Sequence, residues 1–147
     1  MYAKILVPID GSETSNLGLH EAIPLAKSLG SRIRLVHIVN EASLIGPYPV
    51  GDTLNRMLDE LKAHGGAILE TAQAAVQQAQ VPVDSRLVEA YGGAAGEPIL
   101  REAQSWPADL IVCGTHGRRG VRRIVLGSDS EYIVRHSSVP VLLVRAR

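Results

Sequence analysis

Short apolar runs alternate with longer segments of helical periodicity along this chain of 147 residues, and this alternation constrains its fold more than any other feature. Apolar runs bounded by turn residues predict buried strands at Ile5–Ile9, Ile33–Val39, Val83–Ala90, Ala108–Cys113 and Val139–Val144. Helices are predicted at Ser12–Leu29, Asp52–Gln80, Pro98–Gln104 and Asp129–His136. Strands that alternate with helices indicate an α/β fold, an open parallel sheet with helices on both faces. No linker, low-complexity tract or internal repeat divides the sequence, so we expect a single domain over residues 1–147.

Composition limits the classes of function. The 15 basic residues balance the 15 acidic residues, so the formal net charge is +0, which argues against a nucleic-acid partner. No apolar run approaches the length of a membrane span, and we expect a cytoplasmic protein. The one cysteine, Cys113, excludes an intramolecular disulfide, and its apolar strand predicts a buried, inert thiol. His37 also lies in an apolar strand, where we expect a hydrogen-bonded core or crevice residue.

A glycine pattern follows the fourth predicted strand. Gly114-Thr115-His116-Gly117 is separated by nine residues from Gly127-Ser128, which opens the last predicted helix. Glycines let a backbone turn approach a ligand closely, and the free N–H groups at a helix N-terminus favour anions. The pattern therefore predicts a phosphate-binding loop, whereas its other reading is two ordinary turns with Ser128 as a helix cap.

The ends of two predicted strands point to the same place. Asp10 ends the first strand and Gly114 ends the fourth. In open parallel sheets, ligands bind beyond the carboxyl ends of the strands, at the point where the strand order reverses. Asp10 and Gly114 share that crevice if the first and fourth strands are neighbours.

The order and spacing of these pieces resemble the universal stress protein family, in its ATP-binding branch, over essentially the whole chain. The resemblance is carried by Val7-Pro8-Ile9-Asp10-Gly11-Ser12, Leu35-Val36-His37-Ile38-Val39, the glycine pattern, and Val139-Pro140-Val141-Leu142-Leu143-Val144. It implies a Rossmann-like fold of the adenine nucleotide alpha hydrolase type, with five parallel strands in the order 3-2-1-4-5. It also implies that ATP, with or without Mg²⁺ or Mn²⁺, binds at the switch point.

The resemblance assigns nucleotide-binding roles by matching position, and it implies neither a catalytic residue nor a protein metal site. Asp10 would hold the ribose or approach the phosphates, and Pro8 and Ile38 would line the adenine site. The residues that would wrap the triphosphate are Gly114, Thr115, His116, Gly117, Arg118, Arg119 and Gly120. Those that would hold the phosphate tail are Gly127, Ser128, Asp129 and Ser130.

Two features of this site leave alternatives open. The Asp129 carboxylate would repel phosphate, so either a divalent cation lies between them or the side chain points to solvent, and we expect the second. Arg118, Arg119, Arg122 and Arg123 form a dense basic run without interleaved aromatic residues. This run favours a solvated helix face, with Arg118 or Arg119 near phosphate, over a nucleic-acid patch.

The leading functional hypothesis is an ATP-binding regulator or partner module in the stress response, acting on a client protein. One alternative is a weak ATP hydrolase or phosphotransferase assisted by His116 and Asp10. Another is an interaction module with a vestigial site. No G-x-S-x-G elbow surrounds Ser128, which argues against a nucleophile there. The apolar strand Val139–Val144 ends the sheet, and its free edge predicts a homodimer, which the resemblance also implies. The alternative is that loops of the same chain cover this edge.

Overall fold

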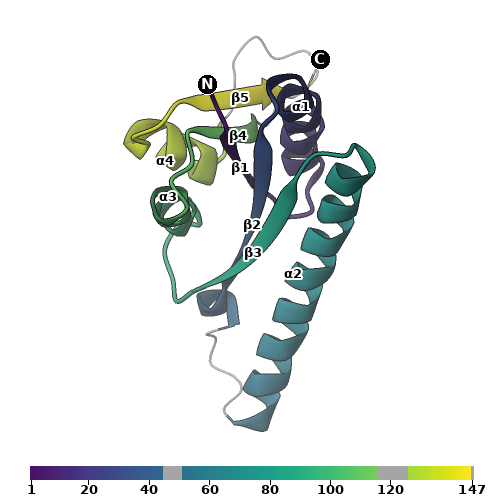
Figure 1. The fold of residues 1–147 in the computed structure, drawn as a ribbon. Coiled ribbons are helices and arrows are strands. Elements are labelled where there is room, and N and C mark those ends of the chain that lie inside the picture. Colours follow the sequence, from purple (N-terminus) through teal and green to yellow (C-terminus); the bar gives the residue numbers. More distant parts are fainter. Residues whose placement is uncertain (45–50, 116–125, 147) are drawn as a thin grey trace.

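The computed structural model describes residues 1–44, 51–115 and 126–146, and there the chain forms one parallel sheet in the order β3-β2-β1-β4-β5 (Figure 1). The predicted fold class and strand order are therefore confirmed. The strands are β1 (Lys4–Pro8), β2 (Arg32–Asn40), β3 (Val83–Ala90), β4 (Leu110–Thr115) and β5 (Val141–Arg145). The helices are α1 (Glu13–Leu29), the 3₁₀ turn η1 (Glu41–Leu44), α2 (Asp52–Gln78), α3 (Gly96–Ser105) and α4 (Ser128–His136).

The ends of α1 follow from local chemistry. Ser12 is the N-cap, and its side chain accepts a hydrogen bond from the backbone N–H of Ser15 at 3.1 Å. Gly30 ends the helix in the left-handed conformation, with φ of 68°. The predicted helix, Ser12–Leu29, therefore has the correct C-terminal end and begins one residue before the observed first residue, Glu13. Pro24 lies inside the helix, which nevertheless continues to Leu29.

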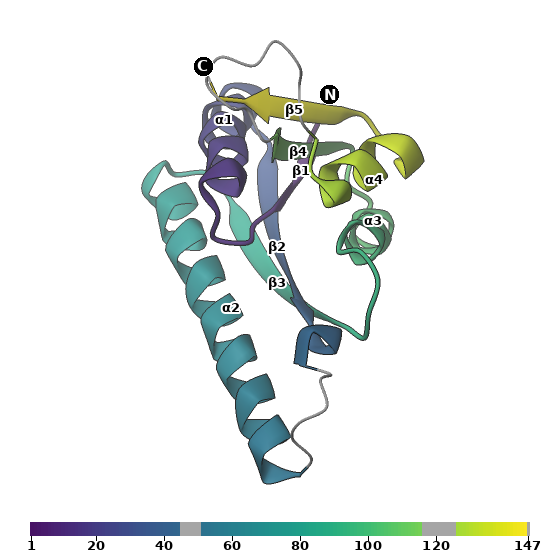
Figure 2. The ribbon, with the colours of Figure 1, turned by 180° about the vertical axis from the view of Figure 1, so that it is seen from behind.

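Helices cover both faces of the sheet, and each face has its own core (Figures 1 and 2). Helices α1 and α2 cover one face, and helices α3 and α4 cover the other. The first core includes Ile5, Val7, Leu19, Ala22, Ile33, Leu35, Leu69 and Val76. The second includes Leu6, Val36, Ile99, Ala103, Trp106, Ile111 and Ile133. In the part of the chain that the structure describes, no helix is both long and apolar enough to span a bilayer.

Strand β2 sends alternate side chains to the two faces. Leu35 belongs to the α1/α2 core, and His37 on the same side contacts α2 at Gly65. A Cβ on Gly65 would lie 2.6 Å from the His37 ring, so this glycine allows α2 to pack closely on β2. The other side carries Arg34, Val36 and Ile38 in sequence.

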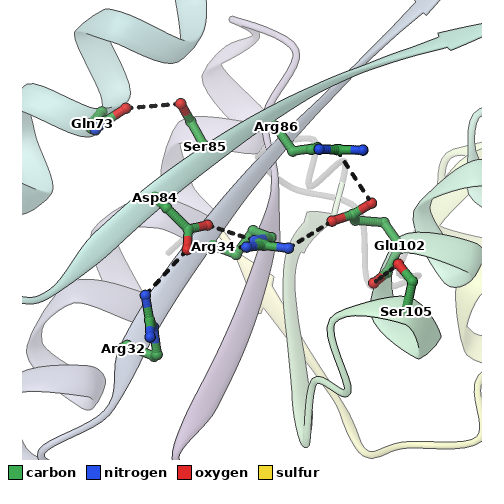
Figure 3. Close-up of polar contacts among 8 residues, drawn as sticks. All are labelled: Arg32, Arg34, Gln73, Asp84, Ser85, Arg86, Glu102 and Ser105. Atoms are coloured by element: carbon green, nitrogen blue, oxygen red, sulfur yellow. Dashed lines mark hydrogen bonds and ion pairs between the residues drawn. The ribbon is translucent and has the colours of Figure 1, made fainter.

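A group of paired charges lies at the N-terminal end of β2 and β3, on the α3/α4 face (Figure 3). Arg34 donates two hydrogen bonds to Asp84, at 2.5 and 3.1 Å, and one to Glu102 of α3 at 3.0 Å. Its guanidinium also lies 4.7 Å from the centre of the Trp106 ring. We call Arg34, Asp84, Glu102 and their flanking partners the Arg34 cluster; the partners are Arg32 and Arg86.

Candidate functional site

A cleft of about 200 Å³ opens at the carboxyl ends of β1 and β4 on the α3/α4 face. Its position is the switch point of the sheet, because β1 pairs with β2 on one side and with β4 on the other. Its walls come from β1, β2, β4, the turn between β1 and α1, the first turn of α1, the N-terminal part of α3, and α4. The lining residues are Pro8, Ile9, Asp10, Ser12, Thr14, Ser15, Val36, Ile38, Ala95, Ile99, Cys113, Gly114, Gly127, Ser128, Asp129, Ser130 and Ile133.

The structure brings most of the described predicted residues together in this cleft. They are Pro8, Asp10, Ile38, Gly114, Gly127, Ser128, Asp129 and Ser130. The others are placed differently. The side chain of Thr115 is buried at the end of β4 rather than in the cleft lining, and within the described chain its hydroxyl has no hydrogen-bond partner. His116, Gly117, Arg118, Arg119 and Gly120 lie outside the described residues.

One part of the cleft is apolar. Pro8 and Ile38 come from neighbouring strands, and Ala95, Ile99 and Ile133 come from the start of α3 and from α4. These last three were not predicted as site residues, although the apolar spacing of the two helices is a signal that such side chains face inward. A slot walled by aliphatic side chains suits a flat, largely apolar ring.

The turn after β1 is held by its own side chains. A carboxylate oxygen of Asp10 accepts a hydrogen bond from the backbone N–H of Ser12 at 2.8 Å. The backbone N–H of Asp10 donates to the Ser15 hydroxyl at 3.3 Å. Partial burial raises the pKa of Asp10, but the hydrogen bonds from Ser12 and Ser15 outweigh it and leave the pKa below its ordinary value. The cleft therefore carries an ionised carboxylate at this end.

The N-terminus of α4 forms the opposite wall. Gly127 is its N-cap and makes no side-chain cap hydrogen bond. The first N–H groups of a helix have no intrahelical partner, so they are available to an anion. The Ser130 hydroxyl donates to the carbonyl oxygen of Gly114 at 3.2 Å, which fixes the start of α4 against the end of β4.

Close backbone packing explains Gly114. A Cβ at this position would overlap the carbonyl oxygen of Thr14 in α1. The facing residue of α1 is also a glycine, and a Cβ on Gly18 would lie 2.9 Å from the backbone nitrogen of Gly114. The sequence had indicated a glycine that approaches a ligand. In the structure, its lack of a side chain lets α1 cross the end of β4 closely.

Asp129 corrects one expectation. Its side chain is partly buried, and Oδ1 accepts a hydrogen bond from the backbone N–H of Gly96 at 3.2 Å. The prediction that this carboxylate points to solvent is therefore wrong, because it caps the first turn of α3. Within residues 1–44, 51–115 and 126–146, no group of three or more His, Cys, Asp or Glu side chains forms a metal site.

Two other predictions concern Cys113, which lines the cleft, and His37, whose side chain lies on the α1/α2 side of β2. Cys113 is buried, and this burial raises the pKa of its thiol to about 11, so it is a poor nucleophile at neutral pH. His37 is also buried, with Nδ1 2.7 Å from the carbonyl oxygen of Ile9. Because a carbonyl only accepts, Nδ1 carries the proton in this contact. Both predictions are confirmed.

Solved structures share this fold. A universal stress family protein from Burkholderia pseudomallei has a TM-score of 0.80 and 32% identity, covering 99% of this chain and 97% of its own. At lower identity, the Arabidopsis thaliana protein At3g01520, solved with AMP bound, has a TM-score of 0.71 and 18% identity, covering 99% and 92%. A universal stress protein solved with cAMP has a TM-score of 0.69 and 23% identity, covering 98% and 97%. The last two similarities concern the fold alone.

Curated sequences match at similar coverage. Universal stress protein YxiE of Bacillus subtilis is 35% identical, over 99% of this chain and 100% of its own length. Universal stress protein MJ0531 of Methanocaldococcus jannaschii is 30% identical, over 99% of this chain and 83% of its own length. The model of the universal stress protein family matches residues 1–145. The chain therefore belongs to the universal stress protein family.

Proposed function

We propose that this protein binds ATP in the cleft, in the manner of the family's ATP-binding branch, and acts in the cytoplasm as a single-domain, nucleotide-dependent regulator in the stress response. The observation that carries the proposal is the pairing of an aliphatic slot with an uncapped helix N-terminus in one cleft. The slot suits an adenine ring, and the helix end suits phosphate.

The proposed contacts follow from the walls of the cleft. Pro8 and Ile38 contact the adenine ring, and Asp10 accepts hydrogen bonds from the ribose hydroxyls. The phosphates lie at Gly127, Ser128 and Ser130. The segment that follows Gly114 contributes the remaining phosphate contacts of the proposal, through His116, Gly117, Arg118, Arg119 and Gly120.

Adenine nucleotides are a ligand class that this fold can hold, since the Arabidopsis protein was solved with AMP and another family member with cAMP. We propose binding rather than rapid turnover for this chain. Asp10, the carboxylate that follows β1, is held by the backbone N–H of Ser12 and has a lowered pKa, so it is a weak general base. A bound nucleotide would then change how the protein binds its client protein.

Calorimetric titration with ATP and with adenosine tests the proposal. We expect Asp10→Ala to lower the affinity for both ligands by about tenfold, about 1.4 kcal/mol, because both carry the ribose. Asp59→Ala, which removes an exposed carboxylate of α2, is the matched control and should change neither affinity. A wild-type chain that takes up neither ligand at millimolar concentration contradicts the proposal.

We further propose that the chain is a homodimer through β5. Among the described residues this strand pairs only with β4, and Leu142 on it is 37% exposed. A free strand edge beside an exposed apolar side chain favours pairing with a second copy around a two-fold axis. Sedimentation should give a dimer at micromolar concentration and a shift toward monomer for Leu142→Lys. A monomeric wild type contradicts this assembly.

A further inference from the structure

The described walls of the cleft carry negative charge without a compensating side chain. Two carboxylates line it, Asp10 after β1 and Asp129 in the first turn of α4, and the described lining contains no Lys, Arg or His. Both carboxylates accept hydrogen bonds from backbone N–H groups, those of Ser12 and Gly96, and neither forms an ion pair with a described residue. A phosphate at the start of α4 would therefore meet like charge.

The structure gives a reason for a carboxylate at Asp129 that has nothing to do with a ligand. The N-cap position of α3 is Ala95, which has no side-chain oxygen to cap the helix. Asp129 supplies that oxygen from the neighbouring helix, through its bond to Gly96. A Cβ at Gly96 would lie 2.9 Å from Tyr132 and 3.1 Å from the Asp129 carbonyl oxygen, so the two helix ends are in close contact. The acceptor is needed there, whereas its charge is not.

We propose that Asp129 is a specificity residue that makes the cleft discriminate between adenine nucleotides by their phosphate charge. This inference rests on the proposed function. Its carboxylate disfavours each added phosphate charge, so uncomplexed ATP binds less tightly than the contacts to its phosphates would otherwise allow. Adenosine has no phosphate, so the Asp129 carboxylate does not change its affinity. The penalty is Coulombic, and it is therefore stronger in a partly enclosed cleft than in open water.

Asp129→Asn separates the two roles of this side chain. The amide oxygen can still accept the bond from Gly96, while the charge is removed. We expect about fivefold tighter binding of ATP in EDTA, smaller gains for ADP and AMP in that order, and less than a twofold change for adenosine. Raising the ionic strength from about 0.1 M to about 1 M shortens the Debye length from about 10 Å to about 3 Å and should reduce the gain for ATP.

Glu131→Gln is the matched control. It removes one carboxylate from the same turn of α4, but Glu131 is paired with Arg135 at 2.8 Å and lies outside the cleft lining. It should leave the ratio of ATP to adenosine affinity unchanged. A second variant, Asp129→Ala, removes charge and cap together, so it should show the same shift in that ratio with a lower melting temperature.

The outcomes are distinguishable. If Asp129→Asn changes the affinities for ATP and adenosine by the same factor, or weakens ATP alone, the inference is overturned while the proposed function stands. If the wild type binds neither ligand, both are overturned. A gain for ATP that grows with the number of phosphates and fades with salt supports it.

Discussion

The α3/α4 face of the sheet carries two polar regions that handle charge in opposite ways. In the Arg34 cluster, at the N-terminal end of the strands, Arg34 is bound on one side by Asp84 and on the other by Glu102 (Figure 3). At the carboxyl end, Asp10 and Asp129 have backbone N–H donors and no described cation. In the first region, the described side chains neutralise one another's charges. In the second, the described carboxylates have no such partner, and their polar groups can contact a ligand.

The difference arises along a single strand. Arg34, Val36 and Ile38 occupy one side of β2 and belong in turn to the cluster, the buried core and the cleft. Secondary structure is the same at all three positions, so it does not distinguish a stabilising region from a binding region. The distinction comes from whether the facing helix supplies opposite charge, as Glu102 of α3 does for Arg34.

The largest expected effect is at Glu102. Glu102→Ala leaves the buried side of Arg34 without its carboxylate, and we expect a loss of about 3 kcal/mol in the free energy of unfolding, measured by urea denaturation. Glu97→Ala is the matched control, because Glu97 is another glutamate of α3 that pairs with an arginine, Arg101. Both side chains of that pair are exposed, so the substitution should lower the free energy of unfolding by less than about 0.5 kcal/mol. Equal losses would show that the cluster is not a stabilising region.

A smaller effect is expected where the scaffold positions the cleft. Gly18→Ala places a methyl group 2.9 Å from the backbone of Gly114, which cannot move aside as a side chain would, and should cost about 2 kcal/mol. Gly66→Ala is matched as a helical glycine with open space around it, and it should stabilise by up to about 1 kcal/mol. Thermal unfolding measures both, and a stabilised Gly18→Ala variant would contradict the close packing.

Thr115 sharpens the comparison, because it is a polar group that neither region uses. Its buried hydroxyl has no partner in the described chain, so Thr115→Val should stabilise by about 1 kcal/mol. The contrasting variant is Ser31→Ala, since the Ser31 hydroxyl is equally buried but donates to the carbonyl oxygen of Tyr2 at 2.5 Å. It should destabilise by about the same amount. If denaturation shows that both variants have a lower free energy of unfolding than wild type, the Thr115 hydroxyl makes a stabilising hydrogen bond.

The smallest expected effect is the pH dependence at Asp10. Its pKa in the folded protein lies below the ordinary value of 3.8, so its ionised form stabilises the fold fully above that value. This stabilisation is lost as the pH falls through the lowered pKa. The difference in unfolding free energy between wild type and Asp10→Asn should therefore be constant near neutral pH and shrink in acid. If this difference in unfolding free energy grows in acid, the pKa of Asp10 is raised in the folded protein rather than lowered.

Local patterns predicted the fold well. The strand positions, the cap at Ser12 and the end at Gly30 each depend on neighbours in sequence, and the structure places them within about two residues of expectation. The strand order came from the resemblance and not from these patterns. Asp10 and Gly114 were placed correctly at the crevice because both end strands, and parallel strands end on the same edge.

The missed features depend on contacts between distant segments. Asp129 binds Gly96, 33 residues away, and Arg34 binds Glu102, 68 residues away. In the sequence, Arg34 is one polar residue in an apolar strand. Its spacing of two from Val36 indicates that both side chains lie on one face of that strand. No periodicity identifies the carboxylates that complete the cluster, because they come from other elements.

The strand order has a consequence for the nascent chain. β1 is made first and ends at the centre of the sheet, yet Ile5 and Leu6 pair with Leu110 and Ile111 of β4. Synthesis of the roughly 70 residues between β2 and β4 takes about 4 to 14 s at about 5–20 residues per second. During that interval β1 can pair with β2 but keeps its other edge open, beside the apolar side chains of Ile5 and Leu6. The interior strand of the finished protein is therefore the exposed edge of the growing one, where a ribosome-bound chaperone has most to protect.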